Sequence, residues 1–380
     1  QETSLETSGM TAEASTGGVQ INYVPKDGGN DFKAYGVVSY ANKSLQQSNL
    51  TDALRARGVT SAGEIKRNDA VAMGLGGPLK RDRLWFYTAH RRWGTDEIQP
   101  GAFFNKSTNP FAYVPDRDQP AYTHLTNRDH SVRVTWQVSP SNKITVSESL
   151  QSNINAYLGT NALISPESSQ YLTYFPQSLT AVTWSHPASN RLLIEAGAGY
   201  MHNPKATPLQ DGVTLDSVQV NDTGTGQRWG AFATTGSTAY SAKGQAGHQM
   251  NGRASASYIT GSHAVKAGIT FYQGWDHVDR YVTQSLSYTL RNGVPNSVTQ
   301  YAMPLVYDNN MSSNGVYAQD QWTLGRFTLT GGVRADFFVG TVKPADLPAA
   351  RFLPARHFDG VNNVPNWKDV SPRFGIAYDV

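Results

Sequence analysis

The sequence predicts an all-β fold, an antiparallel transmembrane β-barrel, and three observations support this. Apolar and polar residues alternate with a period of two, the period at which side chains of a strand change faces. Short turns and long polar segments follow one another in alternation. Aromatic residues gather beside the short turns. Together these features are typical of strands that cross a lipid bilayer.

The alternation is clearest in residues 327–337, where Phe327 and Leu329 lie on one side and Thr328 and Arg334 on the other. Similar patterns recur in residues 131–138, 191–200, 265–271 and 373–378. One face of each predicted strand is therefore apolar and the other polar. Helical periodicity is nowhere comparable.

The predicted connections fall into two classes. Short turns are expected at residues 77–83, 139–142, 186–190, 261–262 and 324–326. Long polar segments are expected near residues 43–65, 94–127, 154–176, 203–246, 276–312 and 341–370. Transmembrane barrels pair short periplasmic turns with long extracellular loops. From Asp31 onward the turns delimit about twelve strands, each near the roughly 9 to 11 residues that a tilted transmembrane strand needs.

Six aromatic residues near the short turns or the end of the chain are predicted to form a membrane-interface girdle. They are Trp85, Trp136, Trp184, Tyr258, Trp322 and Tyr378. Amphipathic rings favour the boundary between hydrocarbon and headgroups. The alternative interpretation is cross-strand aromatic packing in a soluble sheet.

The composition agrees with β-strands joined by polar loops. Charged residues make up 16% of the 380 residues, against roughly 25% in a typical soluble domain. The net charge of +3 is small and the Lys and Arg residues are dispersed, so no nucleic-acid partner is predicted. The chain contains no Cys, which excludes disulfides and thiolate metal sites. No stretch reaches the roughly 18 consecutive apolar residues of a transmembrane helix.

Charged residues on the polar side of the predicted strands are candidates for lining the lumen, because charges are costly against hydrocarbon and acceptable against water. The candidates are Arg133, Glu195, Arg253, Lys266, Arg334, Asp336 and Arg373. The alternative is that these residues only solvate the lumen and contact a plug, without touching a ligand.

Residues 17–32 resemble the end of the plug domain of TonB-dependent outer-membrane transporters. The resemblance consists of a Gly-Gly pair, a strand with an Asn, and a Lys-x-Gly-x-Asn-x-Phe turn. Its residues are Gly17, Gly18, Asn22, Lys26, Gly28, Asn30 and Phe32. Residues 76–87 look like the Gly-Gly-Pro hairpin of the Oar-like branch, and residues 317–322 and 371–378 resemble barrel strands of these transporters.

The resemblance implies a barrel of about 22 strands whose lumen holds a plug. Residues 1–30 would be the C-terminal end of the plug and its linker to the barrel, and residues 31–380 a partial barrel. The chain would then be a fragment of a receptor in the outer membrane of a Gram-negative bacterium, surrounded by outer-membrane lipid. Such a receptor imports a siderophore, an oligosaccharide or a peptide, and the TonB complex acts on a segment upstream of Gln1.

Ligand capture is expected in the long loops, because binding residues concentrate on loops held by a rigid scaffold. The candidates with stacking faces are Phe103, Phe104, Tyr113 and Trp229. Ordinary loop packing would use the same residues.

No catalytic residue, metal site or cofactor is predicted. The pairs Asp129-His130 and Asp276-His277 are adjacent in sequence, so in a strand their side chains point to opposite faces. Three alternatives to energy-coupled transport remain at this point: a structural barrel or adhesin without active transport, an outer-membrane hydrolase, and a soluble β-sandwich that binds carbohydrate.

Overall fold

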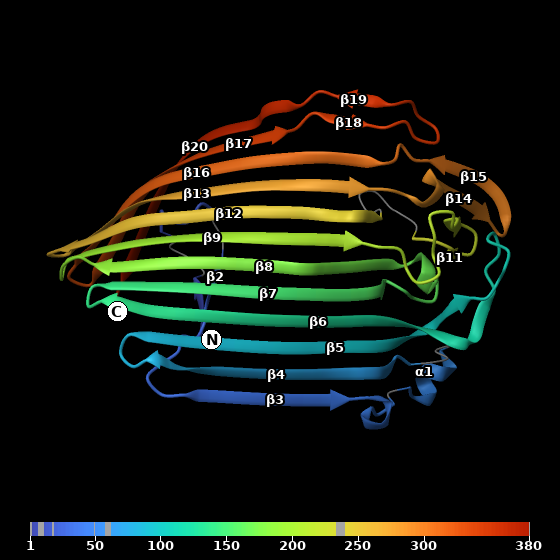
Figure 1. Cartoon of the computed structure of the whole chain (residues 1–380), viewed down its shortest axis with the longest axis horizontal. Helices are drawn as coiled ribbons and strands as arrows, with labels where there is room; N and C mark the ends of the chain where they lie inside the picture. Colours follow the sequence, from blue (N-terminus) through green and yellow to red (C-terminus); the bar gives the residue numbers. More distant parts are fainter. Residues whose placement is uncertain are drawn as a thin grey trace.

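The computed structural model describes residues 2–6, 11–16, 19–48, 50–57, 62–232 and 240–379. Most of these residues belong to one large antiparallel sheet, with two small sheets and the long loops at one end of its strands and a third small sheet behind its middle (Figure 1). The short helices are η1 (Lys43–Leu45), α1 (Asp52–Ala56), η2 (Pro166–Ser168) and η3 (Thr283–Ser285). Among the described residues, no helix has the length and apolar character needed to cross a bilayer.

Twelve strands form the large sheet. They are β3 (Lys33–Ala41), β4 (Glu64–Lys80), β5 (Leu84–Asn105), β6 (Pro115–Ser139), β7 (Asn142–Leu158), β8 (Gln170–Pro187), β9 (Leu192–Thr207), β12 (Ser241–Thr260), β13 (His263–Arg280), β16 (Leu305–Leu324), β17 (Phe327–Val342) and β20 (Val361–Tyr378). Each strand pairs with the preceding and the following strand of this series, and β3 and β20 form the two edges. The predicted all-β class and the number of strands are confirmed.

The division into short turns and long loops is also confirmed. The short turns after β4, β6, β8, β12 and β16 all lie at one end of the sheet, and the long connections lie at the other (Figure 1). Asp82 and Gly261 adopt positive φ values of 60° and 57° in two of these turns, a region that Gly and Asp tolerate better than most residues.

The predicted strand lengths are too short. β5 has 22 residues and β6 has 25, and these two strands extend through most of the range 94–127 that the sequence assigns to a loop. The reason is that strands pair through backbone hydrogen bonds, which do not require apolar side chains. Where the wall extends beyond the bilayer, both faces become polar, and a strand there has the composition of a loop.

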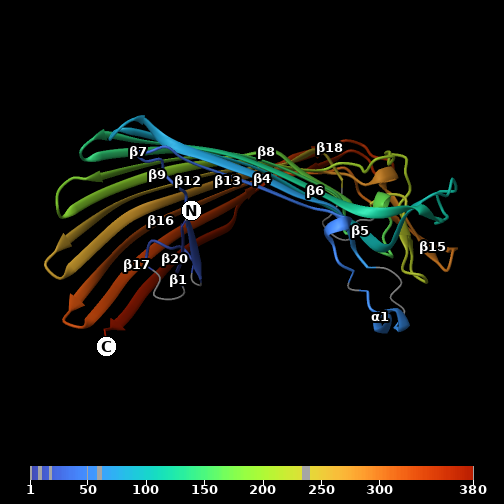
Figure 2. The ribbon, with the colours of Figure 1, turned by 90° about the horizontal axis from the view of Figure 1, so that it is seen from below.

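The two faces of the sheet differ in polarity. Directly paired residues share a face, so Val146, Val182 and Ala198 form part of one face. Many apolar side chains on that face are exposed, and Val182 retains 40% and Ile269 54% of their accessible surface. Figure 2 shows that the sheet is arched, with the N-terminal strands beneath the arch. The convex face is therefore the apolar, membrane-facing one.

Glu148 is an exception on the convex face. It pairs with Val132 and Thr180 and accepts a hydrogen bond from the Thr180 hydroxyl. A carboxylate facing lipid is costly, and this single local partner offsets part of the cost.

The small sheets belong to the N-terminal segment and the long loops. β1 (Glu2–Glu6) pairs with β2 (Gln20–Val24), and β18 (Ala345–Leu347) pairs with β19 (Arg356–Phe358). The loops after β9 and β13 together form a four-stranded sheet of β10 (Val220–Asp222), β11 (Arg228–Trp229), β14 (Leu286–Arg291) and β15 (Val294–Gln300). Val218, Val220, Trp229 and Leu290 form its hydrophobic core.

The Asp222 side chain links the two loops. Its carboxylate accepts hydrogen bonds from the backbone N–H groups of Gly224 and Thr225 in its own loop, and of Asn292 and Gly293 in the other. These four bonds, which favour the charged form, outweigh the effect of burial and lower the pKa of Asp222. The loops after β9 and β13 are thus joined into one packed unit.

Candidate functional site on the concave face

The seven predicted lumen-lining residues lie on the concave face. The register makes this explicit for Arg334, which pairs with Tyr317 on β16, which in turn pairs with Gly268 on β13. Five of the seven contact, or support a contact with, residues 11–16, here called the N-terminal segment. Their role in transport stays a prediction, but the structure brings these five together.

Glu13 of the N-terminal segment is the negative centre of this contact. Its carboxylate forms a short ion pair with Lys266 on β13, and its second oxygen lies 3.6 Å from the guanidinium of Arg253 on β12. The Glu13 side chain keeps 26% of its accessible surface. Two cations from neighbouring strands therefore hold one carboxylate at the wall.

Arg334 on β17 holds the backbone of the same segment. Its Nη1 donates to the carbonyl oxygens of Glu13 at 3.0 Å and Ala12 at 3.4 Å. The Arg334 side chain is only 3% exposed, and Asp336 pairs with it through contacts of 2.7 to 2.9 Å. The guanidinium is thus charge-paired and aimed at the N-terminal segment. Arg373 on β20 adds a bond of 3.4 Å to the Ala14 carbonyl.

Two glycines permit this close packing. Gly315 lies between Arg334 and Thr270, and a Cβ at that position would overlap the guanidinium; without one, Arg334 reaches across β16 to the Thr270 hydroxyl at 2.8 Å. Gly332 faces Ala12, where a Cβ would come within 3.1 Å of the Ala12 methyl group. The wall is therefore shaped to the backbone of the N-terminal segment.

A second contact joins the predicted linker to β6 and β7. Asp27 pairs with Arg133, accepts a hydrogen bond from the Thr135 hydroxyl at 2.9 Å, and lies 3.7 Å from Lys143. Burial by itself would raise the pKa of Asp27, but the hydrogen bonds from Arg133 and Thr135 and the charges of Arg133 and Lys143 lower it below its ordinary value of 3.8.

Asp27 yields a pH prediction. A carboxylate with a depressed pKa stabilises the folded state above its ordinary pKa and loses this contribution as the pH falls through the lowered value. We expect Asp27→Asn to lower the unfolding temperature by the same amount at pH 7 and at about pH 5, and the difference from wild type to shrink only below pH 3.8. Thermal unfolding of both proteins across this range checks it. Asp31→Asn, at an exposed carboxylate nearby, is the matched control. A difference that already disappears at about pH 5 would contradict the assignment.

Other predicted junction residues anchor the linker to the first turn. The Asn30 amide donates to Asp82 at 2.5 Å, and its oxygen accepts from the Asp82 backbone at 2.9 Å and from the Trp85 indole at 2.7 Å. Gly28 packs against the Phe86 backbone, and Phe32 stacks edge-on to the Phe86 ring at 6.4 Å.

The remaining junction residues carry less information. Lys26 is exposed. Gly17 and Gly18 lie outside the described residues, as does the side chain of Asn22.

Trp85 departs from the predicted aromatic girdle. It pairs with Thr135 on the concave face, and its indole binds the linker. The other five aromatics lie on the convex face near the short turns: Trp136, Trp184, Tyr258, Trp322 and Tyr378. The reason is that residues 84–87 are apolar throughout, so alternation cannot assign their faces, and only the register with β6 does.

The predicted loop-capture residues mostly pack against other loops. Trp229 is 3% exposed, and its indole donates to the Pro110 carbonyl at 3.0 Å. The Tyr113 ring lies 6.2 Å from it, and Phe104 packs edge-on against Tyr157. Phe103 is half-buried. In this conformation Trp229 supports the loop core and presents no free stacking face.

The structure pairs some of the acid and His residues across strands. His277 contacts Asp308 at 2.8 Å, whereas Asp276 accepts from Gln245. His130 contacts His90 at 3.0 Å. Within the described part of the chain, no group of three or more His, Asp or Glu side chains is arranged to hold a metal ion.

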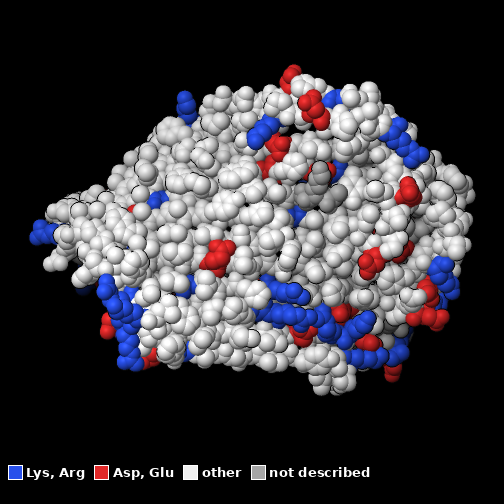
Figure 3. Space-filling model, in the orientation of Figure 1, with Lys and Arg blue, Asp and Glu red and all other residues white. Residues whose placement is uncertain are grey.

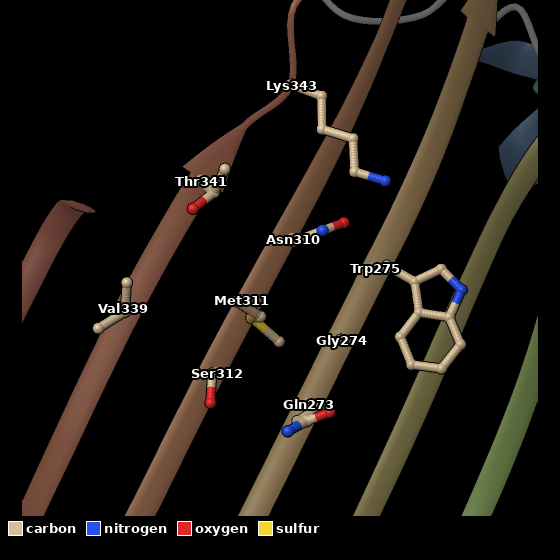
Figure 4. Close-up of a pocket in the computed structure, with 9 residues that line it drawn as sticks. All are labelled: Gln273, Gly274, Trp275, Asn310, Met311, Ser312, Val339, Thr341 and Lys343. Atoms are coloured by element: carbon tan, nitrogen blue, oxygen red, sulfur yellow. The ribbon is translucent and has the colours of Figure 1, made fainter. Parts of the chain in front are cut away.

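A hollow on the convex face lies over β13, β16 and β17 (Figure 4). The register places Trp275, Asn310 and Thr341 side by side there, and Lys343 points toward them. Because this hollow opens on the outer side of the wall, it is separate from the concave site.

A family model described as an outer membrane beta barrel domain matches residues 98–380. The chain belongs to this family. The barrel therefore lies in the outer membrane of a Gram-negative bacterium. Barrels of this kind place short turns in the periplasm and long loops outside. No curated protein matches the chain in sequence.

Solved outer-membrane barrels share the fold. The outer membrane transporter YddB from Escherichia coli is 12% identical, with a TM-score of 0.64 over 100% of this chain and 45% of that one. The ferric yersiniabactin uptake receptor FyuA from Yersinia pestis is 12% identical, with a TM-score of 0.55 over 94% and 46%. The outer-membrane ferripyoverdine receptor of Pseudomonas aeruginosa is 13% identical, with a TM-score of 0.57 over 100% and 44%. The likeness establishes the fold, and this chain spans less than half the length of these proteins.

Proposed function

We propose that the chain is part of a TonB-dependent outer-membrane receptor that takes up a substrate by energy-coupled transport. The contact between the N-terminal segment and the concave face supports this proposal best. A passive pore needs an open lumen, whereas here a backbone segment lies against the concave face of the wall and is held by Lys266, Arg253 and Arg334.

In this proposal residues 1–30 are the end of a plug and its linker, and residues 31–380 are the first part of a barrel of about 22 strands. The Gly-Gly-Pro hairpin at residues 76–87 suggests that the receptor belongs to the Oar-like branch of these transporters. The TonB complex would act on a segment upstream of Gln1.

The chemistry of the contact suits a plug that moves. Most of its bonds are ion pairs and hydrogen bonds to charged groups, which water can replace once the segment shifts. When the segment leaves, the Arg334 guanidinium is still paired with Asp336. This matters because a buried charge without a partner is costly.

Substrate capture is assigned to the extracellular loops. Siderophores, oligosaccharides and peptides all present groups that aromatic and amide side chains bind. Phe103 and Phe104 are half-buried and remain candidates for this contact. The lumen residue Glu195, on β9 opposite Ser255, is a candidate for contact along the path.

Uptake by whole cells tests the proposal. Cells that express the intact gene should accumulate a siderophore, oligosaccharide or peptide supplied outside, and should lose accumulation when TonB is deleted or when the proton gradient is collapsed. A substrate panel measured in paired strains with and without TonB gives the comparison. Uptake that is unchanged without TonB would contradict energy coupling. Ion conduction by the purified protein alone in a planar bilayer, which would indicate a lumen that is open at rest, would also contradict it.

A further inference from the structure

Three arginines on neighbouring strands break the apolar character of the convex face. They are Arg67 on β4, Arg92 on β5 and Arg128 on β6, here called the outer arginine cluster. Arg92 pairs directly with Arg128 on one side and with Val71 on the other. Because paired residues share a face and Val71 and Val132 are exposed there, the cluster points away from the lumen.

Figure 3 looks onto the same face as Figure 1 and shows this interruption. Lys and Arg side chains gather over β4, β5 and β6, with acidic side chains between them, while much of the remaining wall is uncharged. Charged side chains that face hydrocarbon are expensive, so the cluster needs a polar environment on the outer side of the barrel.

The position of the cluster along the strands supplies that environment. Arg128 precedes the girdle residue Trp136 by eight residues, from 136 − 128, which at about 3.3 Å per residue is roughly 26 Å along the strand. With a tilt of about 40° this is roughly 20 Å of height, near the upper edge of an apolar band of about 25 Å. A long Arg side chain reaches from there to the headgroups. The direction is toward the long loops, hence toward the outer leaflet.

Two carboxylates hold the Arg67 side chain in place. Its guanidinium donates to both carboxylate oxygens of Asp96, at 3.1 and 3.2 Å, and to Asp69 at 2.7 Å. Gly94 makes this possible, because a Cβ there would come within 2.9 Å of the Arg67 guanidinium. The cluster scaffold is therefore ordered by the protein itself.

The positive charges of Arg92 and Arg128 are only partly neutralised by neighbouring carboxylates. Arg92 pairs with Asp69, which already serves Arg67. Arg128 is exposed and has no hydrogen-bond or ion-pair partner within the described part of the chain. Three arginines face the two carboxylates of Asp69 and Asp96, so the excess is 3 − 2, or one positive charge, beside a His124 that also binds Asp96.

Like charges directly opposite each other on neighbouring strands destabilise a sheet. An anion between Arg92 and Arg128 removes this cost, and guanidinium groups bind phosphate in a planar, often bidentate geometry. The outer leaflet of a Gram-negative outer membrane is built of glycolipids whose sugar headgroups carry phosphates, and basic clusters at membrane level recognise such lipids.

We propose that the outer arginine cluster binds a phosphate of the outer-leaflet glycolipid, lipid A, between Arg92 and Arg128. The bound lipid would neutralise the paired arginines and fix the height of β4, β5 and β6 in the membrane. The site lies outside the barrel and does not depend on the transport proposal.

The test uses the full-length protein purified from outer membranes and stripped of lipid in detergent. Native mass spectrometry measures the binding of bisphosphorylated lipid A, of dephosphorylated lipid A, and of the phosphorylated form with inorganic phosphate in excess. We expect wild type to retain the phosphorylated lipid and the double variant Arg92→Gln/Arg128→Gln to bind it about 30-fold more weakly, since each arginine near an anionic lipid surface contributes about 1 kcal/mol and 1.4 kcal/mol is tenfold.

Arg91→Gln is the matched control. Arg91 is adjacent in sequence, equally charged and exposed, but it pairs with Ala72 and Asp129 on the concave face, so its removal should leave lipid binding unchanged. Equal binding of the dephosphorylated lipid by wild type would overturn the proposal, and this arm needs no variant to fold. The same loss in Arg91→Gln, no loss in the double variant, or full displacement by inorganic phosphate would also overturn it.

Discussion

Replacing Arg334 with Met is expected to lower the free energy of unfolding of the wall by about 3 to 5 kcal/mol, the usual cost of removing one partner of a buried ion pair. Asp336 would remain, 17% exposed and without its cation. The N-terminal segment would at the same time lose the bonds to the Ala12 and Glu13 carbonyls. Thermal unfolding of the full-length protein, followed as the mobility shift of the folded barrel on gels, measures the first effect.

A second readout separates docking from wall stability. Ala14 is 9% exposed, so a cysteine at this position should react slowly with a thiol reagent in wild type and several-fold faster in Arg334→Met. In Arg334→Leu/Asp336→Leu the wall regains much of its stability because no buried charge is left alone, while the Ala14 position stays reactive. Arg326→Met, in the exposed β16–β17 turn, is the control. Slow labelling in all three variants would mean that Arg334 does not hold the segment.

Replacing Val182 with Arg is expected to destabilise the barrel by about 1 to 2 kcal/mol. Val182 lies two residues above the girdle residue Trp184, and the cost of an arginine facing lipid rises from about 0 to 1 kcal/mol at the interface to about 2 to 4 kcal/mol at the bilayer midplane. Val182 lies on the convex face and is 40% exposed. Its neighbour Thr183 is also exposed but faces the concave side, so Thr183→Arg should cost little.

Reversible unfolding into denaturant from lipid vesicles gives both free energies. The comparison is matched in residue introduced, strand and depth, and differs only in the face. Equal destabilisation by the two substitutions, or a larger loss from Thr183→Arg, would contradict the assignment of the convex face to lipid.

Local patterns predicted the parts of this structure that local physics determines. A period of two sends Arg334 and Lys266 to the polar face whatever lies elsewhere, so their orientation follows from the sequence alone. Turn chemistry located the short hairpins, such as the one at Gly261.

The contacts that make the site are non-local and escaped prediction. Glu13 meets Lys266 across 253 residues of chain, and nothing in either neighbourhood indicates the other. The same holds for Trp229. Its indole donates to the carbonyl of Pro110, which lies in a loop more than a hundred residues away in the sequence. Trp85 was assigned to the wrong face because the apolar run around it has no alternation.

The outer arginine cluster shows a further limit. Arg92 and Arg128 stand in segments that the sequence assigned to a loop or to its border, where a charge needs no explanation. Only the register, which extends the strands through this range and places both arginines opposite each other on the convex face, turns them into an unusual feature.

Cysteine scanning along β17 tests the central claim, that this sheet is an outer-membrane wall with a lipid-facing convex side and the N-terminal segment on its concave side. The chain has no native Cys, so single cysteines can be placed from Val333 to Phe337. We expect strict alternation in native outer membranes. Fluorophores attached at positions 333, 335 and 337 should be quenched by lipid-soluble quenchers, and the free cysteines there should be spared by a polar thiol reagent. Positions 334 and 336 should escape the lipid-soluble quenchers and react with the polar reagent, more readily when residues 11–16 are deleted. Uniform aqueous labelling, or lipid exposure of positions 334 and 336, would contradict the account.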